Sequence, residues 1–301
     1  MTLRGKSSTP VPVQLYRSIL LLLHLLAGVL TVALLFPFFG KARRRLAVRR
    51  WSERTLAFLN VERRIRGEPP ALHGRPAVLV ANHVSWLDIY VVHAVWQVRF
   101  IAKSEVRNWP VIGWLSARTG TLFIERANRR HAAQINRAIH SAFLEGDAIG
   151  VFPEGTTTFG DEVGRFHASL LQPAVDEHAL VYPVALRYLD LNGRINRNAA
   201  YVGDTSLLES MRAILAEPGI VAEIIFLPPI DAEGRSRRDL ARETRAAIAA
   251  ALNLPVSDSA PGISGDPQAE PPTGAGPTDN PNPAPADSVA PAIRAQTSDR
   301  K

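Results

Sequence analysis

The stretch AVLVANHVSWLD, residues 77–88, passes from an apolar run directly into a group of polar side chains. Its first part, AVLVAN (77–82), has the length and composition of a buried β-strand. His83 and Asp88 follow at a spacing of five residues, too long for one face of a regular helix. Two interpretations stay open: Asp88 orients His83 as a general base, or Asp88 caps a helix while His83 packs in the core.

The region from about 61 to 254 alternates short apolar runs with longer mixed segments. We expect strands at 77–82, 99–103, 121–125, 148–152, 180–188 and 221–227. We expect helices at 86–97, 128–145, 168–178, 206–216 and 236–252. Strands that alternate with helices in this way predict an α/β domain with a mixed, largely parallel sheet flanked by helices.

The N-terminal segment 18–39 contains 22 residues and no Lys, Arg, Asp or Glu. As a helix it would extend ~30 Å, the thickness of the hydrocarbon core of a bilayer. A secretory signal peptide and a buried core helix are disfavoured, because the apolar run is long for either. We expect a membrane anchor, as a spanning or a shallow in-plane helix. Six cations lie within 41–50, against three before the segment, so the positive-inside rule places the rest of the chain in the cytoplasm.

The composition of the chain excludes several kinds of functional site and suggests what kind of partner it binds. The chain has 301 residues, a net charge of +7, and no cysteine, which excludes disulfides, thiolate zinc sites and a cysteine nucleophile. The charge suggests an anionic partner. Because the basic cluster adjoins the apolar segment, we expect membrane lipid and not nucleic acid. We divide the chain into an anchor with a basic helix (1–60), a folded domain (61–254) and a disordered Pro/Gly/Ala-rich tail (255–301).

Two further strand ends carry polar groups, and ligands collect at the carboxyl ends of strands in open α/β sheets. In FPEGTTTFG (152–160), Pro153 and Gly155 favour a tight turn with Glu154 at its apex. In FIER (123–126), Arg126 is placed to hold a phosphate, as is Lys103 at the end of its own strand. An ordinary glycine turn and solvated cations are the alternatives. The sequence has neither a nucleophile elbow nor a Walker loop, which favours direct transfer to a substrate hydroxyl.

Four segments together resemble the glycerolipid acyltransferase family, which includes the 1-acylglycerol-3-phosphate acyltransferases. They are NHVSWLD (82–88), FIER (123–126), FPEGT (152–156) and VYPVAL (181–186), in the family's order and spacing. The resemblance covers about residues 60 to 230. It implies the family's fold and an O-acyltransferase that makes phospholipid, located on the cytoplasmic face of a bacterial inner membrane and anchored by 18–39.

The resemblance also implies roles for individual residues. His83, oriented by Asp88, would deprotonate a lysolipid hydroxyl, which attacks the thioester of acyl-CoA or acyl-carrier protein. No cofactor or metal is implied, and the oligomeric state stays open. The implied substrate-binding residues are Lys103 and Arg126 for the acceptor's phosphate, Glu154, Gly155 and Thr156 for positioning the acceptor, and Pro183 for the wall near the acyl chain.

One position departs from the family's pattern. Many members continue FPEGT with Arg-Ser, and this arginine is thought to help bind the acceptor's phosphate, whereas this chain has Thr157. With threonine at this position, the chain resembles branches of the family that include the lyso-ornithine-lipid acyltransferases. We place 1-acylglycerol-3-phosphate first as acceptor and lyso-ornithine lipid as the alternative. The rival functions are a non-catalytic lipid-binding protein and a lipid hydrolase.

Overall fold

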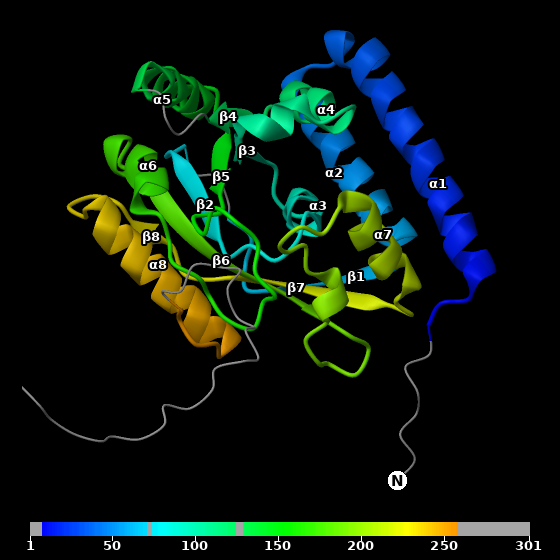
Figure 1. The fold of residues 1–301 in the computed structure, drawn as a ribbon. Helices are drawn as coiled ribbons and strands as arrows, with labels where there is room; N and C mark the ends of the chain where they lie inside the picture. Colours follow the sequence, from blue (N-terminus) through cyan, green and yellow to red (C-terminus); the bar gives the residue numbers. More distant parts are fainter. Residues whose placement is uncertain (1–7, 71–73, 125–128, 258–301) are drawn as a thin grey trace, which may run out of the picture. The chain divides into compact units, whose positions relative to one another are not determined.

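The computed structural model describes residues 8–70, 74–124 and 129–257 (Figure 1). The described residues all belong to the first of two units of the chain, and the second, residues 264–301, lies entirely outside the described ranges. Most of the predicted tail and the candidate Arg126 therefore fall outside the described residues.

The first unit contains a mixed sheet whose strands follow the order β1-β7-β6-β2-β5-β3-β4, with β8 paired to β6. Strands β2, β3, β4 and β5 run parallel, and β6 is antiparallel to β7 and β8. This confirms the expected sheet, mixed and mostly parallel. The strands are β1 (Val61–Arg66), β2 (Ala77–Ala81), β3 (Val98–Lys103), β4 (Leu122–Ile124), β5 (Ala148–Val151), β6 (Leu180–Leu189), β7 (Ile220–Phe226) and β8 (Ile230–Asp231).

Helices cover both faces of the sheet, and strand residues alternate between the two cores. Leu79 of β2 packs with α2 (Lys41–Phe58), α3 (Leu87–His93) and α7 (Leu207–Ala216). Its neighbour Val80 packs with the opposite layer. That layer contains α5 (Arg129–Leu144), α6 (Gln172–Asp176) and α8 (Arg237–Leu252). A strand buried on both sides explains why 77–82 reads as one continuous apolar run.

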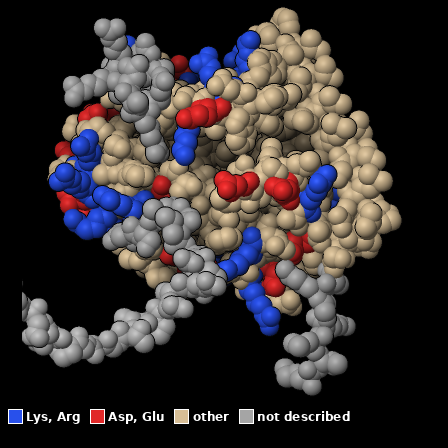
Figure 2. Space-filling view, viewed as in Figure 1, with Lys and Arg blue, Asp and Glu red and all other residues tan. Residues whose placement is uncertain are grey.

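The N-terminal segment forms a long apolar helix. It comprises α1 (Val11–Leu30), a π-turn η1 (Thr31–Leu35) and a 3-10 turn η2 (Phe36–Phe38). Together they make 28 residues that are long and apolar enough to cross a membrane. The side of the molecule along which α1 lies shows almost no charged residues in Figure 2.

The structure differs from the expected elements at several places, among them the short strand β8 (Ile230–Asp231), which was not expected. Strand β1 was not expected, because VERRIR has only two apolar residues, Val61 and Ile65; it is a charged edge strand. Helix α3 ends at His93, not at 97, because the chain must turn back before β3 starts at Val98. Helix α4 (Ile112–Arg118) and the 3-10 turns η3 (Ser104–Asn108), η4 (Ala168–Leu171) and η5 (Arg197–Ala199) were also not expected as such.

Candidate active site

The ends of β2 and β5 meet at the carboxyl edge of the sheet. The two strands are parallel neighbours, with Val80 opposite Val151. Beyond them, the backbone N–H of Thr158 donates to the carbonyl oxygen of His83 at 2.9 Å. The structure thus brings together two of the three predicted polar strand ends, while the key residue of the third, Arg126, lies outside the described part of the chain.

Asp88 is fully buried in the first turn of α3 and surrounded by donors. Its Oδ2 accepts from the backbone N–H groups of Val84 (2.8 Å) and Ser85 (3.0 Å) and contacts His83 Nδ1 at 2.7 Å. Its Oδ1 accepts from the hydroxyl of Tyr188 at 2.6 Å. Asp88 therefore closes the turn that precedes α3 and also holds the imidazole. It does not cap the helix, whose N-cap is Trp86. The contact with His83 is the one that a general-base role requires, and that role stays a prediction.

His83 is turned toward the surface, with 20% of its side chain exposed. Because a carboxylate only accepts hydrogen bonds, the contact with Asp88 places a proton on Nδ1 and leaves Nε2 free to accept one. The Phe152 ring stacks on the imidazole at 4.1 Å between centroids and 12° between planes. The imidazole is thus fixed in orientation by a carboxylate at one nitrogen and by an aromatic ring on one face.

Tyr188 is a site residue that the sequence did not reveal. It lies on β6, a hundred positions after Asp88, and its side chain is buried. Burial, and then the Asp88 carboxylate, raise the pKa of Tyr188 well above its usual range, so the phenol stays protonated and donates. The signal in the sequence is weak: a tyrosine near the end of the mostly apolar strand LVYPVALRYL.

Two neighbours of His83 anchor its loop to the rest of the fold. The side chain of Asn82 donates to the carbonyl of Leu186 (2.9 Å) and accepts from its N–H (2.8 Å), so an amide replaces a strand pairing at the end of β2. The indole N–H of Trp86 donates to Ser210 Oγ on α7 at 3.0 Å. Both contacts give the loop a fixed position relative to β6 and α7.

Glu154 is buried beneath the turn, not displayed at its apex. Its Oε1 accepts the backbone N–H of His83 at 3.1 Å. Burial raises the pKa of Glu154 to about 8, although the hydrogen bond from the His83 amide acts in the opposite direction. The carboxyl group therefore holds the loop that carries His83.

The next three residues of this turn, 155–157, are partly or fully exposed. Gly155 has φ of +71°, a backbone conformation that disfavours any residue with a side chain. Thr156 is exposed, and the Thr157 hydroxyl donates to the carbonyl oxygen of Tyr201. The position where many family members have arginine thus holds a small side chain whose hydroxyl is occupied.

The two remaining candidates lie in different surroundings. Lys103 is exposed at the carboxyl end of β3, where it is paired with Ile124 of β4. Ile124 precedes Arg126 by two positions in the sequence. Pro183 is buried in β6, at the point where pairing with β8 (to Val181) gives way to pairing with β7 (from Val184). A proline, which has no backbone N–H to donate, fits there because Pro183 belongs to neither antiparallel register.

Among the described residues there is no cluster of three or more His, Asp or Glu side chains placed to hold a metal ion. His93, which is near His83 in sequence, contacts the carbonyl oxygen of Val98 at the start of β3 at 3.1 Å. Burial lowers the pKa of His93 to about 4, so this imidazole is neutral and belongs to the core.

Comparisons with known proteins identify the family of this chain. A family model described as Acyltransferase matches residues 62–187. The lyso-ornithine lipid O-acyltransferase of Pseudomonas aeruginosa is 39% identical over 211 residues, which are 70% of this chain and 79% of that protein. The 1-acyl-sn-glycerol-3-phosphate acyltransferase of Neisseria gonorrhoeae is 37% identical over 166 residues, 55% of this chain and 65% of that protein.

A solved structure shows the same fold. The crystal structure of the 1-acyl-sn-glycerophosphate acyltransferase PlsC from Thermotoga maritima matches with a TM-score of 0.62 at 20% sequence identity. The match covers 81% of this chain and 94% of that one. It therefore includes much of the region outside the match to the family model.

Proposed function

Because this chain belongs to the glycerolipid acyltransferase family and is an acyltransferase, we propose that it transfers an acyl group from a soluble thioester to the free hydroxyl of a lysolipid. One observation carries the proposal: His83 Nδ1 lies 2.7 Å from a fully buried carboxylate, while the imidazole stays partly exposed. This arrangement provides a general base that substrate can reach.

The reaction proceeds without a covalent enzyme intermediate. Nε2 of His83 takes the proton of the acceptor hydroxyl while the hydroxyl oxygen attacks the thioester carbonyl. The tetrahedral intermediate then collapses, the C–S bond breaks, and the imidazolium returns the proton to the leaving thiolate. Asp88 keeps its contact with Nδ1 throughout and stabilises the positive charge that forms on the ring. Acyl-CoA and acyl-carrier protein both have this leaving group.

Two buried groups position the base. Tyr188 holds the carboxylate of Asp88 from below, and Glu154 holds the backbone amide of His83 from the side of β5. Neither side chain is exposed, so we assign Glu154 a positioning role instead of direct contact with the acceptor. Lys103, Arg126, Gly155, Thr156 and Pro183 keep their proposed roles in substrate binding.

The acceptor is the open part of the proposal, and Thr157 bears on it. Its hydroxyl is engaged with Tyr201, so this position offers no cation to a phosphate monoester. Lyso-ornithine lipid has no such phosphate. The lyso-ornithine lipid O-acyltransferase of Brucella abortus, 37% identical over 203 residues that make up 76% of that protein, gives the same indication as the Pseudomonas relative. We therefore favour lyso-ornithine lipid, with 1-acylglycerol-3-phosphate as the second candidate.

The N-terminal helix supports an in-plane membrane anchor. Before its start, Thr9 Oγ1 donates to the carbonyl of Glu217 at 2.6 Å, and at its other end Phe36 packs with Leu115. In between, His24 stacks on Trp51 at 5.2 Å. A helix that contacts one body along its whole length cannot place its two ends on opposite sides of a bilayer.

The opposite face of this helix is apolar and exposed. Its residues recur every three or four positions, as one face of a helix does. They are Val11, Leu15, Ile19, Leu22, Leu26, Leu30 and Leu34. We propose that this face lies in one leaflet and that the leaflet is the cytoplasmic one, where acyl-CoA and acyl-carrier protein are available.

An acceptor comparison tests the proposal. Purified protein in detergent is given acyl-CoA or acyl-carrier protein with lyso-ornithine lipid or with 1-acylglycerol-3-phosphate, and the products are separated by mass spectrometry. We expect the ornithine acceptor to be preferred and Thr157→Arg to shift the preference toward the phosphate acceptor. Asn192→Arg, which adds the same charge at an exposed position of the turn after β6, is the matched control. Free fatty acid without an acylated lipid would instead identify a hydrolase.

A further inference from the structure

Two cavities adjoin where α1 ends and α2 begins. The first, which we call the cationic cavity, has a volume of about 500 Å³ and includes Lys41, Arg45 and Arg99 in its lining. The second, the apolar cavity, has about 360 Å³ and is lined by Val32, Ala33, Phe36, Pro37 and Trp114. Phe36, Arg44 and Arg118 line both cavities, so the two meet at these side chains.

The cavities are separate from the candidate active site. Asp147, in the lining of the cationic cavity, directly precedes β5, whereas Phe152 beside His83 directly follows it. Five steps of extended chain separate the two by ~16 Å. Arg99 likewise lies at the start of β3. The cavity thus opens at the amino edge of the parallel strands, and the His83 loop lies at their carboxyl edge.

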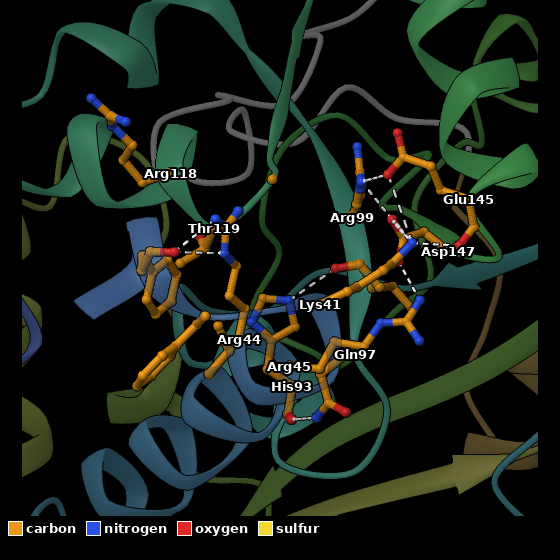
Figure 3. A pocket seen from close by; sticks show the side chains of 15 residues that line it. Lys41, Arg44, Arg45, His93, Gln97, Arg99, Arg118, Thr119, Glu145 and Asp147 are labelled. Atoms are coloured by element: carbon orange, nitrogen blue, oxygen red, sulfur yellow. Dashed lines mark hydrogen bonds and ion pairs between the residues drawn. The ribbon is translucent and has the colours of Figure 1, made fainter. Parts of the chain in front are cut away.

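The cations of the cationic cavity fall into two groups (Figure 3). Lys41, Arg45 and Arg99 all turn toward Asp147, with distances of 2.9 Å from Lys41 and 2.5 Å from Arg99. These three are ion-paired and fasten α2 to the sheet. Of the seven charged side chains in the lining, five are cationic and two are acidic, which leaves an excess of positive charge.

Arg44 and Arg118 carry most of this excess. Among the residues that the structure describes, neither has a carboxylate partner. The guanidinium of Arg44 donates to the carbonyl of Phe36 (2.7 and 3.1 Å) and lies 5.7 Å from the centre of its ring. That of Arg118 lies 5.8 Å from the centre of the Trp114 ring. Two unneutralised arginines therefore stand at the boundary between a polar and an apolar cavity.

The surroundings of this boundary are apolar and exposed. Phe38 has 83% of its surface exposed, and Trp109, Val111 and Trp114 of the neighbouring segment are exposed as well. Exposed aromatic residues beside arginines are typical of protein surfaces at the level of lipid headgroups. The unneutralised charge thus lies where the phosphates of a membrane would be.

We propose that the two cavities together bind one anionic phospholipid of the membrane. Its phosphate would contact the guanidinium groups of Arg44 and Arg118, which match phosphate oxygens in geometry and charge. Its acyl chain would lie against Phe36 and Trp114 in the apolar cavity. The bound lipid would hold the end of α1 at a fixed depth in the leaflet. The proposal requires membrane association but not acyl transfer.

Binding of phosphatidylglycerol to the full-length protein in detergent, followed by native mass spectrometry, tests this site. The readout needs no acyl donor, so it is independent of the proposed reaction. We expect one retained phosphatidylglycerol per chain, and at least about ten-fold weaker binding in Arg44→Gln/Arg118→Gln, from the loss of two charge-assisted contacts. Arg43→Gln/Arg50→Gln removes the same charge from exposed positions of α2 and should bind as the wild type does.

Three results would overturn the proposal. The first is equal loss of binding in both double variants, which would indicate general attraction to a basic surface. The second is unchanged binding in Arg44→Gln/Arg118→Gln. The third is displacement by inorganic phosphate as effective as by phospholipid, which would indicate a free-anion site. If the double variant does not fold, Arg118→Gln alone keeps the test valid, because its guanidinium makes only the ring contact with Trp114 among the described residues.

Discussion

Replacing Tyr188 with phenylalanine tests whether the buried phenol positions the catalytic pair. The substitution keeps the ring in the core and removes one hydroxyl, which donates to Asp88 Oδ1 at 2.6 Å. Oδ2 of Asp88 keeps its three contacts, with His83 Nδ1 and two backbone N–H groups. The carboxylate therefore stays bound on one oxygen and becomes free to rotate on the other.

The expected size of the effect follows from the burial of this contact. A hydrogen bond to a charged group contributes about 1.5–3 kcal/mol. If the full amount is lost from the transition state, kcat falls by about 10- to 150-fold, at about 1.4 kcal/mol per factor of ten. The free energy of unfolding should fall by no more than about 3 kcal/mol. Because Tyr188 is buried, we expect the KM for the acceptor to change little.

Tyr182→Phe is the matched control. Tyr182 lies on the same strand and in the same core as Tyr188, and its hydroxyl has no hydrogen-bond partner among the described residues. Initial rates of acyl transfer are measured for both variants, well below the melting temperature of each. Equal activity of Tyr188→Phe and Tyr182→Phe would refute the positioning role. A change in the KM for the acceptor with kcat unchanged would refute it as well.

Three further predictions concern stability and the anchor. Burial raises the pKa of Glu154 to about 8, so the stability that this carboxyl group contributes is complete below pH ~4.5 and is lost as the pH rises toward 8. The melting temperature of the wild type should therefore fall relative to that of Glu154→Gln between pH 5 and 8. A difference in melting temperature that stays constant over this range would contradict the prediction. A Cβ on Gly28 would lie 2.8 Å from the Trp51 indole nitrogen, so Gly28→Ala should cost about 1–3 kcal/mol of unfolding free energy in chemical denaturation, whereas Gly40→Ala, with no atom within 4 Å, should not. The chain has no cysteine, so Ser8→Cys and Gly40→Cys can each be labelled specifically with a thiol reagent in vesicles. If the helix lies in the plane of the membrane, both positions are labelled from the same side. Labelling from opposite sides would show that the helix spans the bilayer.

Much of the fold could be predicted from the sequence, because local patterns determine it. Strand β2 is buried on both faces, which gives the continuous apolar run that identified it. Strand β1 could not be found in this way. Most of its residues are partly or fully exposed and three of them are arginines, and it is a strand only because β7 supplies its hydrogen bonds.

The candidate site was predicted less completely, because it depends on contacts between distant residues. The spacing of His83 and Asp88 left two interpretations open until the turn between them was known. The contribution of Tyr188 depends on β6 lying beside β2, a pairing that no local pattern reveals. The burial of Glu154 likewise follows from the packing of the turn after β5 against the His83 loop.

The general-base role of His83 is the central claim, and the rate of acyl transfer by His83→Ala tests it most directly. The variant is purified in detergent, its folding is confirmed by melting temperature, and turnover is measured with a saturating acyl donor and lysolipid. We expect a loss of about 10²- to 10⁴-fold with the fold intact. Unchanged turnover in a folded His83→Ala protein would contradict it.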